Sequence, residues 1–355
     1  MEHQKVVPLR TTLPVLSCAY LNVEKDNLTI KTTDLEQTIF SENPINNSQD
    51  GSVCIPMARF NEIISALPSE EITINSNEDN LIEIKNSHGV YKITGRDIKE
   101  FPETTDQEKS ENLELSGEDF LNIINKTGYA TSRDDLKPAL SGVYIKITGD
   151  ELISVATDGH RLVKYIQFKK TNIKTALTIP YKFLKIIKNN LNPKEKININ
   201  VSENSLTTKQ KEFKITTRII KESFPDFNSA IPDNNKIQAE IDVSALTSCL
   251  KRVSIFSNRT TKQTLLSFNK NGVVVSAQDP ENATSAKEHI DCKYQGEDLT
   301  VSYNAKYLIE ALQNNETNTV NLFLSTALTA AILQPSKQKE NEEITTLLMP
   351  LRINA

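Results

Sequence analysis

The sequence predicts an α+β fold built from three copies of one domain. The stretches that begin at Ile55 and at Ile179 both open with Ile-Pro, continue with a helical run and two strand-like runs, and end at Phe-Pro. Pro56 and Pro180 are 124 positions apart, and a weaker third copy has Ser302 at the matching place, 122 positions further on. Self-similarity at a fixed period is the mark of a repeated structural unit.

A polar turn is the second observation behind this fold class. It recurs as Thr33-Asp34, Thr157-Asp158 and Gln278-Asp279, at spacings of 124 and then 121 positions. Solenoid repeats are only about 20 to 50 residues long, so these copies are whole domains. We therefore expect domains at residues 1–109, 110–235 and 236–355, the first of them short at its N-terminal end.

The first half of each copy is a helix followed by a hairpin, most clearly in the second copy. Ser116 and Asp119 form a capping-box pattern that opens a helix through "EDFLNIINKTGYA". "GVYIKIT" then alternates apolar and polar residues, which is the period of a half-buried strand. "ELISVATD" follows across a turn at Gly149-Asp150. This order indicates that each copy mixes α and β elements.

The second half of each copy has the same order. Pro180 stands just before "YKFLKIIKNNL", whose apolar residues recur at helical spacing. "KININV" and "SLTTKQ" read as the next hairpin, and Asn271-Gly272 marks a hairpin in the third copy. We predict two helices and about eight strands per copy, with no βαβ unit and hence an α+β fold.

Composition limits the class of protein. The chain has 355 residues, 37% of them hydrophobic and 25% charged, with a net charge of −5, which is typical of a globular protein. Its four cysteines are far apart and show no zinc-ligand spacing, so we expect reduced thiols, a cytoplasmic location and no metal or cofactor. No apolar run approaches the roughly 18 residues that span a bilayer, and no secretory signal is evident.

Basic residues gather on the predicted helices. Lys182, Lys185 and Lys188 are spaced by three and so share one helix side, away from the apolar stripe. Lys251 and Arg252 occupy another helix, and Lys126 and Lys306 occupy two more. Acidic residues lie mainly in loops and strands. The pattern predicts an acidic protein with a basic helical surface that attracts phosphate groups.

Three short motifs carry a family resemblance. "ATDGHRL" in the second copy, "FPDF" closing that copy and "LLMPLR" near the C-terminus make the chain resemble the bacterial sliding clamp, the β subunit of DNA polymerase III, over nearly its whole length. The resemblance implies a homodimer closed head to tail into a ring with helices lining the pore. The ring would encircle duplex DNA without reading its sequence, have no catalytic residues and not associate with membranes.

The resemblance also implies a groove that receives partner peptides of the form Gln-Leu-x-Leu-Phe. These peptides would belong to the DNA polymerase catalytic subunit, the clamp loader and repair proteins. Apolar walls would bury the Leu and Phe side chains, while Arg and His would supply hydrogen-bond donors to the peptide backbone. By matched position, the groove residues are Leu140, Thr157, Gly159, His160, Arg161, Leu162, Pro225, Ala230, Leu347, Met349, Pro350, Leu351 and Arg352.

Two further residue sets follow from the resemblance and from the basic helices. The residues expected to face DNA are Arg10, Lys126, Lys137, Lys182, Lys185, Lys188, Lys251 and Arg252. At the joint between the two chains, Tyr91 and Ile93 of one chain are expected to pack against Ile255 and Phe256 of the other. A head-to-tail contact closes when it repeats after a half turn.

Two alternatives remain open from the residues alone. Asp158, His160 and Arg161 could form a hydrolase site, with Asp34 and Asp279 as repeated carboxylates. Against it, no nucleophile, metalloprotease or phosphate-loop motif occurs. The second alternative is a scaffold or paralogue of the same fold that no longer closes on DNA, which the short segment ahead of Arg10 suggests.

Overall fold

The structure is a computed structural model of the chain and describes residues 2–46, 49–103 and 110–353. The chain folds into two compact units. The first comprises Met1–Leu121 and Lys182–Ile219, and the second comprises Asn122–Tyr181 and Ile220–Ala355. Each unit therefore joins strands of two successive repeats. The predicted domain boundary after residue 109 falls on residues 104–109, which lie outside the described residues.

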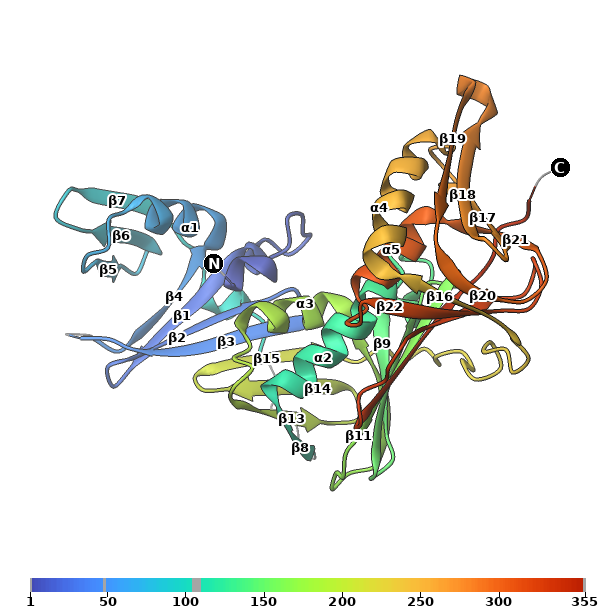
Figure 1. Cartoon of the computed structure of the whole chain (residues 1–355). Coiled ribbons are helices and arrows are strands. Elements are labelled where there is room, and N and C mark those ends of the chain that lie inside the picture. The colour runs from blue at the N-terminus through green and yellow to red at the C-terminus, as the bar shows by residue number, and fades with distance from the viewer. Residues whose placement is uncertain (1, 47–48, 104–109, 354–355) are drawn as a thin grey trace. The chain divides into compact units, whose positions relative to one another are not determined.

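The first unit contains an eight-stranded and a three-stranded antiparallel sheet (Figure 1). The order of the large sheet is β4-β1-β2-β3-β15-β14-β13-β8, and that of the small sheet is β5-β6-β7. The large sheet is continuous across two repeats, because β3 of the first pairs with β15 of the second. In chain order the elements are β1 (Cys18–Glu24), β2 (Asn27–Thr33), β3 (Gln37–Pro44), β4 (Gly51–Pro56), α1 (Met57–Ala66), β5 (Thr73–Ser76), β6 (Leu81–Lys85), β7 (Val90–Thr94), β8 (Glu111–Ser116), α2 (Gly117–Thr127), α3 (Tyr181–Asn190), β13 (Lys196–Val201), β14 (Ser205–Gln210) and β15 (Phe213–Arg218). Helix α2 continues into the second unit beyond Leu121.

The second unit contains a nine-stranded and a four-stranded antiparallel sheet. Their orders are β12-β9-β10-β11-β24-β23-β22-β16-β20 and β19-β18-β17-β21. The large sheet again runs across two repeats, through the pairing of β11 with β24. In chain order the elements are β9 (Gly142–Ile147), β10 (Glu151–Thr157), β11 (Arg161–Phe168), β12 (Thr175–Pro180), β16 (Ile237–Asp242), α4 (Val243–Val253), β17 (Gln263–Asn269), β18 (Gly272–Asp279), β19 (Thr284–Ile290), β20 (Cys292–Gln295), β21 (Leu299–Asn304), α5 (Ala305–Gln313), β22 (Thr319–Leu324), β23 (Ala331–Pro335) and β24 (Glu342–Leu348).

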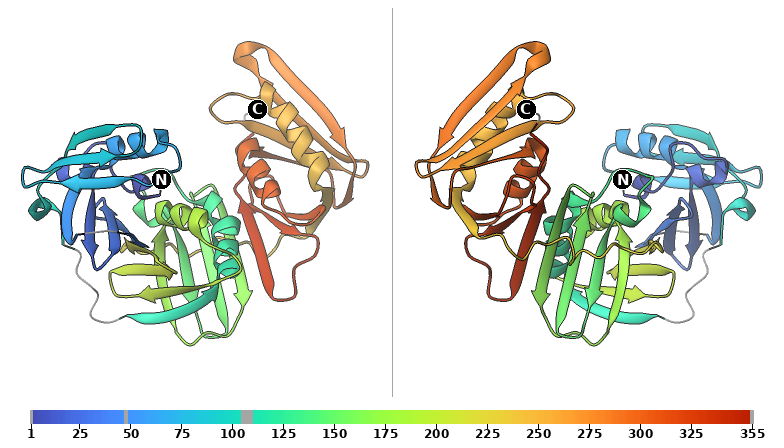
Figure 2. Two further views of the ribbon diagram at one scale, coloured as in Figure 1. Left: turned by 90° about the vertical axis from the view of Figure 1, so that its left-hand side faces the viewer. Right: turned by 90° about the vertical axis from the view of Figure 1, so that its right-hand side faces the viewer.

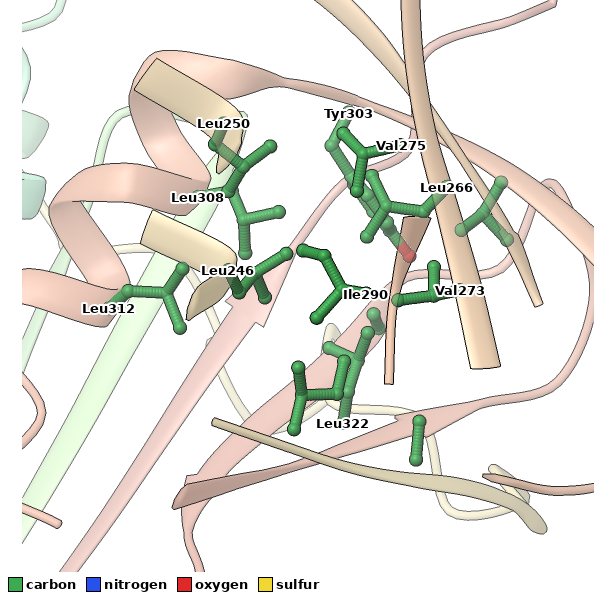
Figure 3. Close-up of a cluster of buried hydrophobic side chains, with 14 of the residues drawn as sticks. Leu246, Leu250, Leu266, Val273, Val275, Ile290, Tyr303, Leu308, Leu312 and Leu322 are labelled. Atoms are coloured by element: carbon green, nitrogen blue, oxygen red, sulfur yellow. The ribbon is translucent and has the colours of Figure 1, made fainter. Parts of the chain in front are cut away.

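The core of the third repeat shows why its helices lie where they do. Helix α4 lies along β18 and β19 and packs beside α5 (Figure 2). Leu246 and Leu250 of α4 and Leu308 of α5 point toward the strands, where they meet Leu266 and Val275 (Figure 3). Each fully buried Leu or Val contributes about 1.5–3 kcal/mol, so the apolar stripe of each helix determines which face it turns to the sheets.

The predicted elements of the second repeat are confirmed. Ser116 Oγ accepts a hydrogen bond from the backbone N–H of Asp119 at 3.0 Å, as the capping pattern requires. "KININV" and "SLTTKQ" are β13 and β14, and the Asn271-Gly272 turn joins β17 to β18. Gly272 has φ +129°, a backbone conformation that favours glycine. Every strand pair among the described residues is antiparallel, in line with the absence of a βαβ unit.

The first repeat differs from the prediction of two helices per copy. Over its described residues it has one α-helix, α1, with strands β1–β7, whereas the later repeats have two α-helices each. Two short 3-10 turns precede β1, one at His3–Lys5 and one at Pro14–Ser17. Pro8 and Pro14 explain the difference, since proline removes a backbone donor and disfavours helix in the residue before it.

The third copy is aligned two residues later than the sequence suggested. Pro56 and Pro180 directly precede α1 and α3, and the residue that directly precedes α5 is Asn304, not Ser302. Asn304 lies 124 positions after Pro180, so the period is constant. Its side chain accepts a hydrogen bond from the N–H of Lys306, and thus caps the helix in the place where the earlier copies have proline.

Candidate functional site

The segment "TDGHR" is a closed polar turn between β10 and β11. Thr157 Oγ1 donates to the carbonyl of Arg161 and accepts from the N–H of Gly159. One carboxylate oxygen of Asp158 accepts from the N–H groups of both His160 and Arg161, at 2.9 and 3.1 Å. Gly159 has φ +90°, so glycine suits this position. The Asp158 carboxylate therefore holds the turn together.

The first repeat contains the same turn 124 positions earlier. Thr33 Oγ1 donates to the carbonyl of Gln37, and Asp34 accepts from the N–H groups of Glu36 and Gln37. The N–H of Leu35 donates to Thr33, and Leu35 takes the left-handed conformation with φ +75°. A hydrogen-bond pattern that recurs without histidine or arginine is a structural feature of the repeat, which argues against the hydrolase alternative.

Arg161 is the most enclosed charged side chain of the site, with 6% of its side chain exposed. Its Nε donates to Asp158 at 3.2 Å, its Nη1 to Glu310 of α5 at 2.5 Å, and its Nη2 to the carbonyl of Tyr129. The guanidinium carbon lies 5.2 Å and 4.6 Å from the ring centroids of Tyr129 and Tyr307. Burial raises the pKa of Tyr129 to about 12, so a neutral phenol packs on the cation.

Arg161, predicted to donate to a bound peptide, is largely enclosed by the protein in this structure. Each of its three nitrogen atoms already donates one hydrogen bond to a group of the protein. The sequence could not show this, because Glu310 and Tyr307 come from the third repeat. His160, in contrast, is exposed and lies with its ring centroid 6.1 Å from that of Tyr307. The exposed member of the predicted pair is thus His160.

Strand pairing brings the predicted groove segments together. Leu162 of β11 lies directly opposite Leu347 of β24, and the chain that leaves β24 runs past the turn, where the N–H of Met349 donates to the carbonyl of His160 at 2.9 Å. Leu351 donates its N–H to the carbonyl of Ser302. Met349 is 47% exposed, Arg352 is exposed, and Pro350 and Leu351 are half-buried. These residues therefore line one surface.

An apolar cluster lies under this surface. Leu162 and Leu347 are buried together with Val155 and Ala330. The "FPDF" corner packs over them, since Phe224 stacks on Tyr144 with ring centroids 5.1 Å apart. The predicted residues Pro225 and Ala230 are exposed on the corner. Leu140 is half-buried in the 3-10 turn Pro138–Leu140, which leads into β9.

The junction between the first two repeats has the same backbone arrangement but a different floor. The N–H of Arg218, the last residue of β15, donates to the carbonyl of Glu36 at 2.9 Å, matching the bond from Met349 to His160. Thr38 and Thr216 face each other where the later junction has Leu162 and Leu347. The apolar floor is thus a property of the second junction and not of the repeated scaffold.

A polar depression of about 270 Å³ borders the turn on its helix side. His160 and Arg161 lie on its wall, so it is continuous with the surface described above. The other lining residues are Thr131, Ser132, Arg133, Asp134, Lys137, Asp158, Lys306, Tyr307 and Glu310. Among the described residues no group of histidine, cysteine, aspartate and glutamate could hold a metal ion.

Comparison with known proteins identifies the family. Three family profiles match consecutive parts of the chain: the N-terminal, central and C-terminal domains of the DNA polymerase III beta subunit, over residues 1–105, 114–226 and 228–352. The chain belongs to the DNA polymerase III beta subunit family. Members of this family are sliding clamps and not enzymes, so the hydrolase alternative is not favoured.

Individual relatives agree with this assignment. A beta sliding clamp of Staphylococcus aureus is 28% identical over 98% of this chain and 94% of its own length. The DNA polymerase III beta subunit of Pseudomonas aeruginosa has a similar structure, with a TM-score of 0.92 and 24% identity over 99% of this chain and 96% of that one. A clamp from the same organism, solved bound to griselimycin, gives a TM-score of 0.90 at 24% identity, covering 99% of this chain and 95% of that one.

One residue expected to face DNA in this clamp is buried. Only 8% of the Lys126 side chain is exposed, and its Nζ pairs with Glu342 at 2.9 Å and with Glu316 at 3.3 Å. The ammonium also lies 4.9 Å from the ring centroid of Tyr165. Lys126 therefore holds α2 to the C-terminal strand, and its assignment to the DNA-facing set is corrected.

The other residues of that set are exposed. Lys182, Lys185 and Lys188 lie on the exposed side of α3, as predicted, and Lys182 pairs with Asp34 of the repeated turn. Lys251 and Arg252 are exposed on α4, although Arg252 already donates to Glu288 at 3.0 and 2.7 Å. Arg10 and Lys137 are exposed in loops.

The residues expected at the joint between two chains lie on exposed parts of the clamp. Tyr91 is 36% exposed on β7, an edge strand of the small sheet, while Ile93 is partly buried against the core of the first unit. Ile255 is 76% and Phe256 38% exposed in the turn that follows α4. An exposed sheet edge and exposed apolar side chains are features that a second chain can cover.

Sequence reasoning missed some of the residues that support the site. Tyr129, Tyr307 and Glu310, which fix Arg161, were not predicted. Phe224 and Phe227 pack against the floor, and both belong to the motif "FPDF" that the sequence analysis singled out.

None of the helices in the part of the chain that the structure describes is long and apolar enough to cross a membrane.

Proposed function

We propose that two copies of this chain close into a ring around duplex DNA in the cytoplasm and tether partner proteins through the surface that His160 and Met349 form over the buried floor of Leu162 and Leu347. The observation that carries this proposal is the apolar floor at the second junction, beside exposed His160 and Met349. The griselimycin complex of the Pseudomonas aeruginosa clamp supports a ligand-binding role for this fold.

The floor suits a short peptide with two or three large apolar anchors. Each buried Leu or Phe contributes about 1.5–3 kcal/mol, and the ordering of the peptide offsets part of that gain. A net affinity near micromolar, about −8 kcal/mol, is the result we expect for a Gln-Leu-x-Leu-Phe peptide. Such weak binding suits a tether that exchanges polymerase, clamp loader and repair partners. The corner carrying Pro225 and Ala230, together with Leu140, would complete the walls.

The exposed basic residues suit contact with the DNA backbone. Lys182, Lys185 and Lys188 project from one side of α3, and Lys251 projects from α4. Contacts of this kind neutralise phosphates and carry no sequence information, which is what a sliding ring needs. We assign the same role to Arg10, Lys137 and Arg252. The net charge of −5 limits non-specific adsorption of the rest of the surface.

The ring itself requires a joint between chains. We propose that Tyr91 and Ile93 of one chain meet Ile255 and Phe256 of the other, and that domains 1–109, 110–235 and 236–355 repeat around the ring. Sedimentation of the double variant Ile255→Ala with Phe256→Ala tests this joint. A mass shifted toward the monomer supports it, and an unchanged dimer mass rules it out.

The tethering surface is tested by fluorescence anisotropy with a labelled Gln-Leu-x-Leu-Phe peptide. The variant Leu162→Thr with Leu347→Thr gives the second junction the floor of the first, and should weaken binding at least tenfold. Truncation after Leu348 removes Met349 and should have the same effect. Ile344→Thr, in β24 but outside the floor, is the matched control and should bind normally. Equal affinities for all four proteins would place the peptide elsewhere.

DNA encirclement is tested separately. After loading, the clamp should stay on circular DNA and leave it when the circle is cut, and reversal of Lys182, Lys185 and Lys188 to Glu should reduce retention without changing peptide affinity. Equal retention on circular and linear DNA would favour the scaffold alternative, in which the fold no longer closes on DNA.

A further inference from the structure

The polar depression beside the groove has an unbalanced set of charges. Three cationic side chains, Arg133, Lys137 and Lys306, are exposed on its rim. Within residues 2–46, 49–103 and 110–353 the structure records no ion pair for any of these three. They come from the loop ahead of β9 and from the first turn of α5, so the fold gathers them around one cavity.

The acidic residues of the same depression are already engaged. Asp158 binds two backbone N–H groups of its turn and the Nε of Arg161. Glu310 binds Nη1 of Arg161, and Asp134 accepts from the N–H of Leu136. The lining residues carry four cations, one of them Arg161, against the three carboxylates of Asp134, Asp158 and Glu310. The depression therefore keeps one net positive charge, presented by the exposed rim cations, which attracts an external anion.

The depression adjoins the proposed peptide surface directly. His160 lies on its wall, and the carbonyl of the same residue holds Met349 at the edge of the apolar floor. A peptide whose apolar anchors lie over Leu162 and Leu347 can therefore place a flanking residue at this cavity as it leaves the floor. Consecutive residues of an extended chain advance by about 3.3 Å, so that flanking residue is close in sequence to the anchors.

From these contacts we infer that the depression recognises an acidic side chain flanking the apolar motif of the partner peptide, and that Arg133, Lys137 and Lys306 determine this preference. The inference rests on the proposed tethering function and adds a substrate preference to it. It also gives Lys137 a place beside the peptide, in addition to the DNA-facing role expected from the sequence. An exposed carboxylate among three cations gains modestly and in a salt-dependent way, because solvent screens each pair.

The test compares matched labelled peptides by fluorescence anisotropy at about 50 mM salt, where screening is weak. All contain Gln-Leu-Ser-Leu-Phe. One pair carries Glu-Glu or Gln-Gln before this motif, and a second pair carries them after it. The protein variant combines Arg133→Gln, Lys137→Gln and Lys306→Gln. Its control combines Lys170→Gln, Lys174→Gln and Lys236→Gln, three exposed lysines outside the proposed sites that change the net charge equally.

We expect one Glu-Glu peptide to bind the unmodified chain about fivefold more tightly than its Gln-Gln partner, which is the effect of roughly one exposed ion pair. The rim variant should bind both peptides of that pair equally and with the neutral affinity of the unmodified chain. The control should keep the preference, and added salt should reduce it.

Two other results would overturn the inference. One is equal binding of all flanks by the unmodified chain, and the other is a preference that survives in the rim variant. If that variant also left circular DNA faster, the three cations would be assigned to phosphates. Failure of the proposed groove is distinct from these results, because the Gln-Gln peptides would then not bind at all.

Discussion

Arg161 of the second repeat and Glu310 of the third form an ion pair, with Nη1 and Oε2 2.5 Å apart, although 149 positions separate the two residues in the sequence. The pair joins the turn beside the groove to helix α5. The shape of the proposed peptide surface thus depends on a contact between two repeats, and the turn is held by charge as well as by its own hydrogen bonds.

Removal of one member of this pair should be costly. Arg161→Ala leaves Glu310 and Asp158 without their counter-ion, and we expect the free energy of unfolding to fall by about 3–5 kcal/mol. Peptide affinity should fall at least tenfold, because the turn that carries His160 loses its support. Urea denaturation and peptide anisotropy measure the two effects. Arg218→Ala, at an exposed arginine, is the control and should change both by little.

A double-mutant cycle separates the pair from the individual side chains. Arg161→Met combined with Glu310→Leu replaces the pair by apolar groups, which is often close to neutral for stability. The double variant should therefore be more stable than Arg161→Met alone. Additive losses in the two single variants would show that the pair is not energetically coupled.

In the repeated turn, substitutions at two matched positions should change stability in opposite directions. Leu35 and Gly159 occupy the same place in successive repeats, with φ +75° and +90°. Leu35→Gly removes left-handed strain of about 1–2 kcal/mol and adds about 0.5–1 kcal/mol of backbone entropy, so the first unit should gain up to about 1 kcal/mol. Gly159→Ala should cost about 1 kcal/mol, although nothing lies within 4 Å of the added methyl group.

Urea titration followed by pulsed hydrogen exchange measures these changes separately in β2–β3 and in β10–β11. A loss of stability in Leu35→Gly would mean that the Leu35 side chain, which is 43% exposed, contributes more by packing than its backbone costs by strain.

Much of the fold could be predicted because its signals are local. The capping pattern at Ser116, the hairpin at Asn271-Gly272 and the apolar spacing in α3 each depend on residues a few positions apart. The period of 124 then extended one repeat to the others. The third copy was aligned two residues too early because Asn304, and not a proline, is the residue before its helix. Asn304 also marks the start of a helix, but a comparison of residue types does not match it to proline.

The site was less predictable because it is assembled from distant segments. The pairing of Leu162 with Leu347 follows from the order of strands in the sheet, and was reached only through the family resemblance. The burial of Arg161 and Lys126 could not be read from the sequence at all. The sequence around a lysine or arginine does not show whether a carboxylate from another repeat pairs with it. Here Glu310 pairs with Arg161, and Glu342 pairs with Lys126.

Lys126 should matter for stability and not for DNA. Lys126→Met keeps the length of the side chain but leaves the carboxylate of Glu342, 18% exposed, without its nearest cation. We expect the free energy of unfolding to fall by about 2–4 kcal/mol, since breaking a largely buried pair costs more than losing an exposed one. Retention on circular DNA should not change. Lys188→Met, on the exposed side of α3, is the matched control, with little loss of stability and weaker retention.

His3 makes the stability of the first unit depend on pH. The side chain is buried against β2 and β3, with Nδ1 3.1 Å from Thr32 Oγ1 and Nε2 2.9 Å from Ser41 Oγ. Burial lowers the pKa of His3 from 6.5 to about 4. The folded state therefore resists protonation over a range in which the unfolded chain accepts a proton.

The first unit should lose stability as the pH falls. Above pH 6.5 the His3 imidazole is neutral in both the folded and the unfolded state, so its full contribution to the free energy of unfolding is present. As the pH falls toward 4 the unfolded state is favoured, and by pH 5 the loss should reach about 2 kcal/mol. Urea titrations at pH 7.5 and pH 5, with β2 and β3 followed by pulsed exchange at one labelling pH, measure it. His3→Asn should lose this component, and His88→Asn, at an exposed histidine, should retain it. An identical pH dependence in all three proteins would show that carboxylates, and not His3, govern the acid stability of this unit.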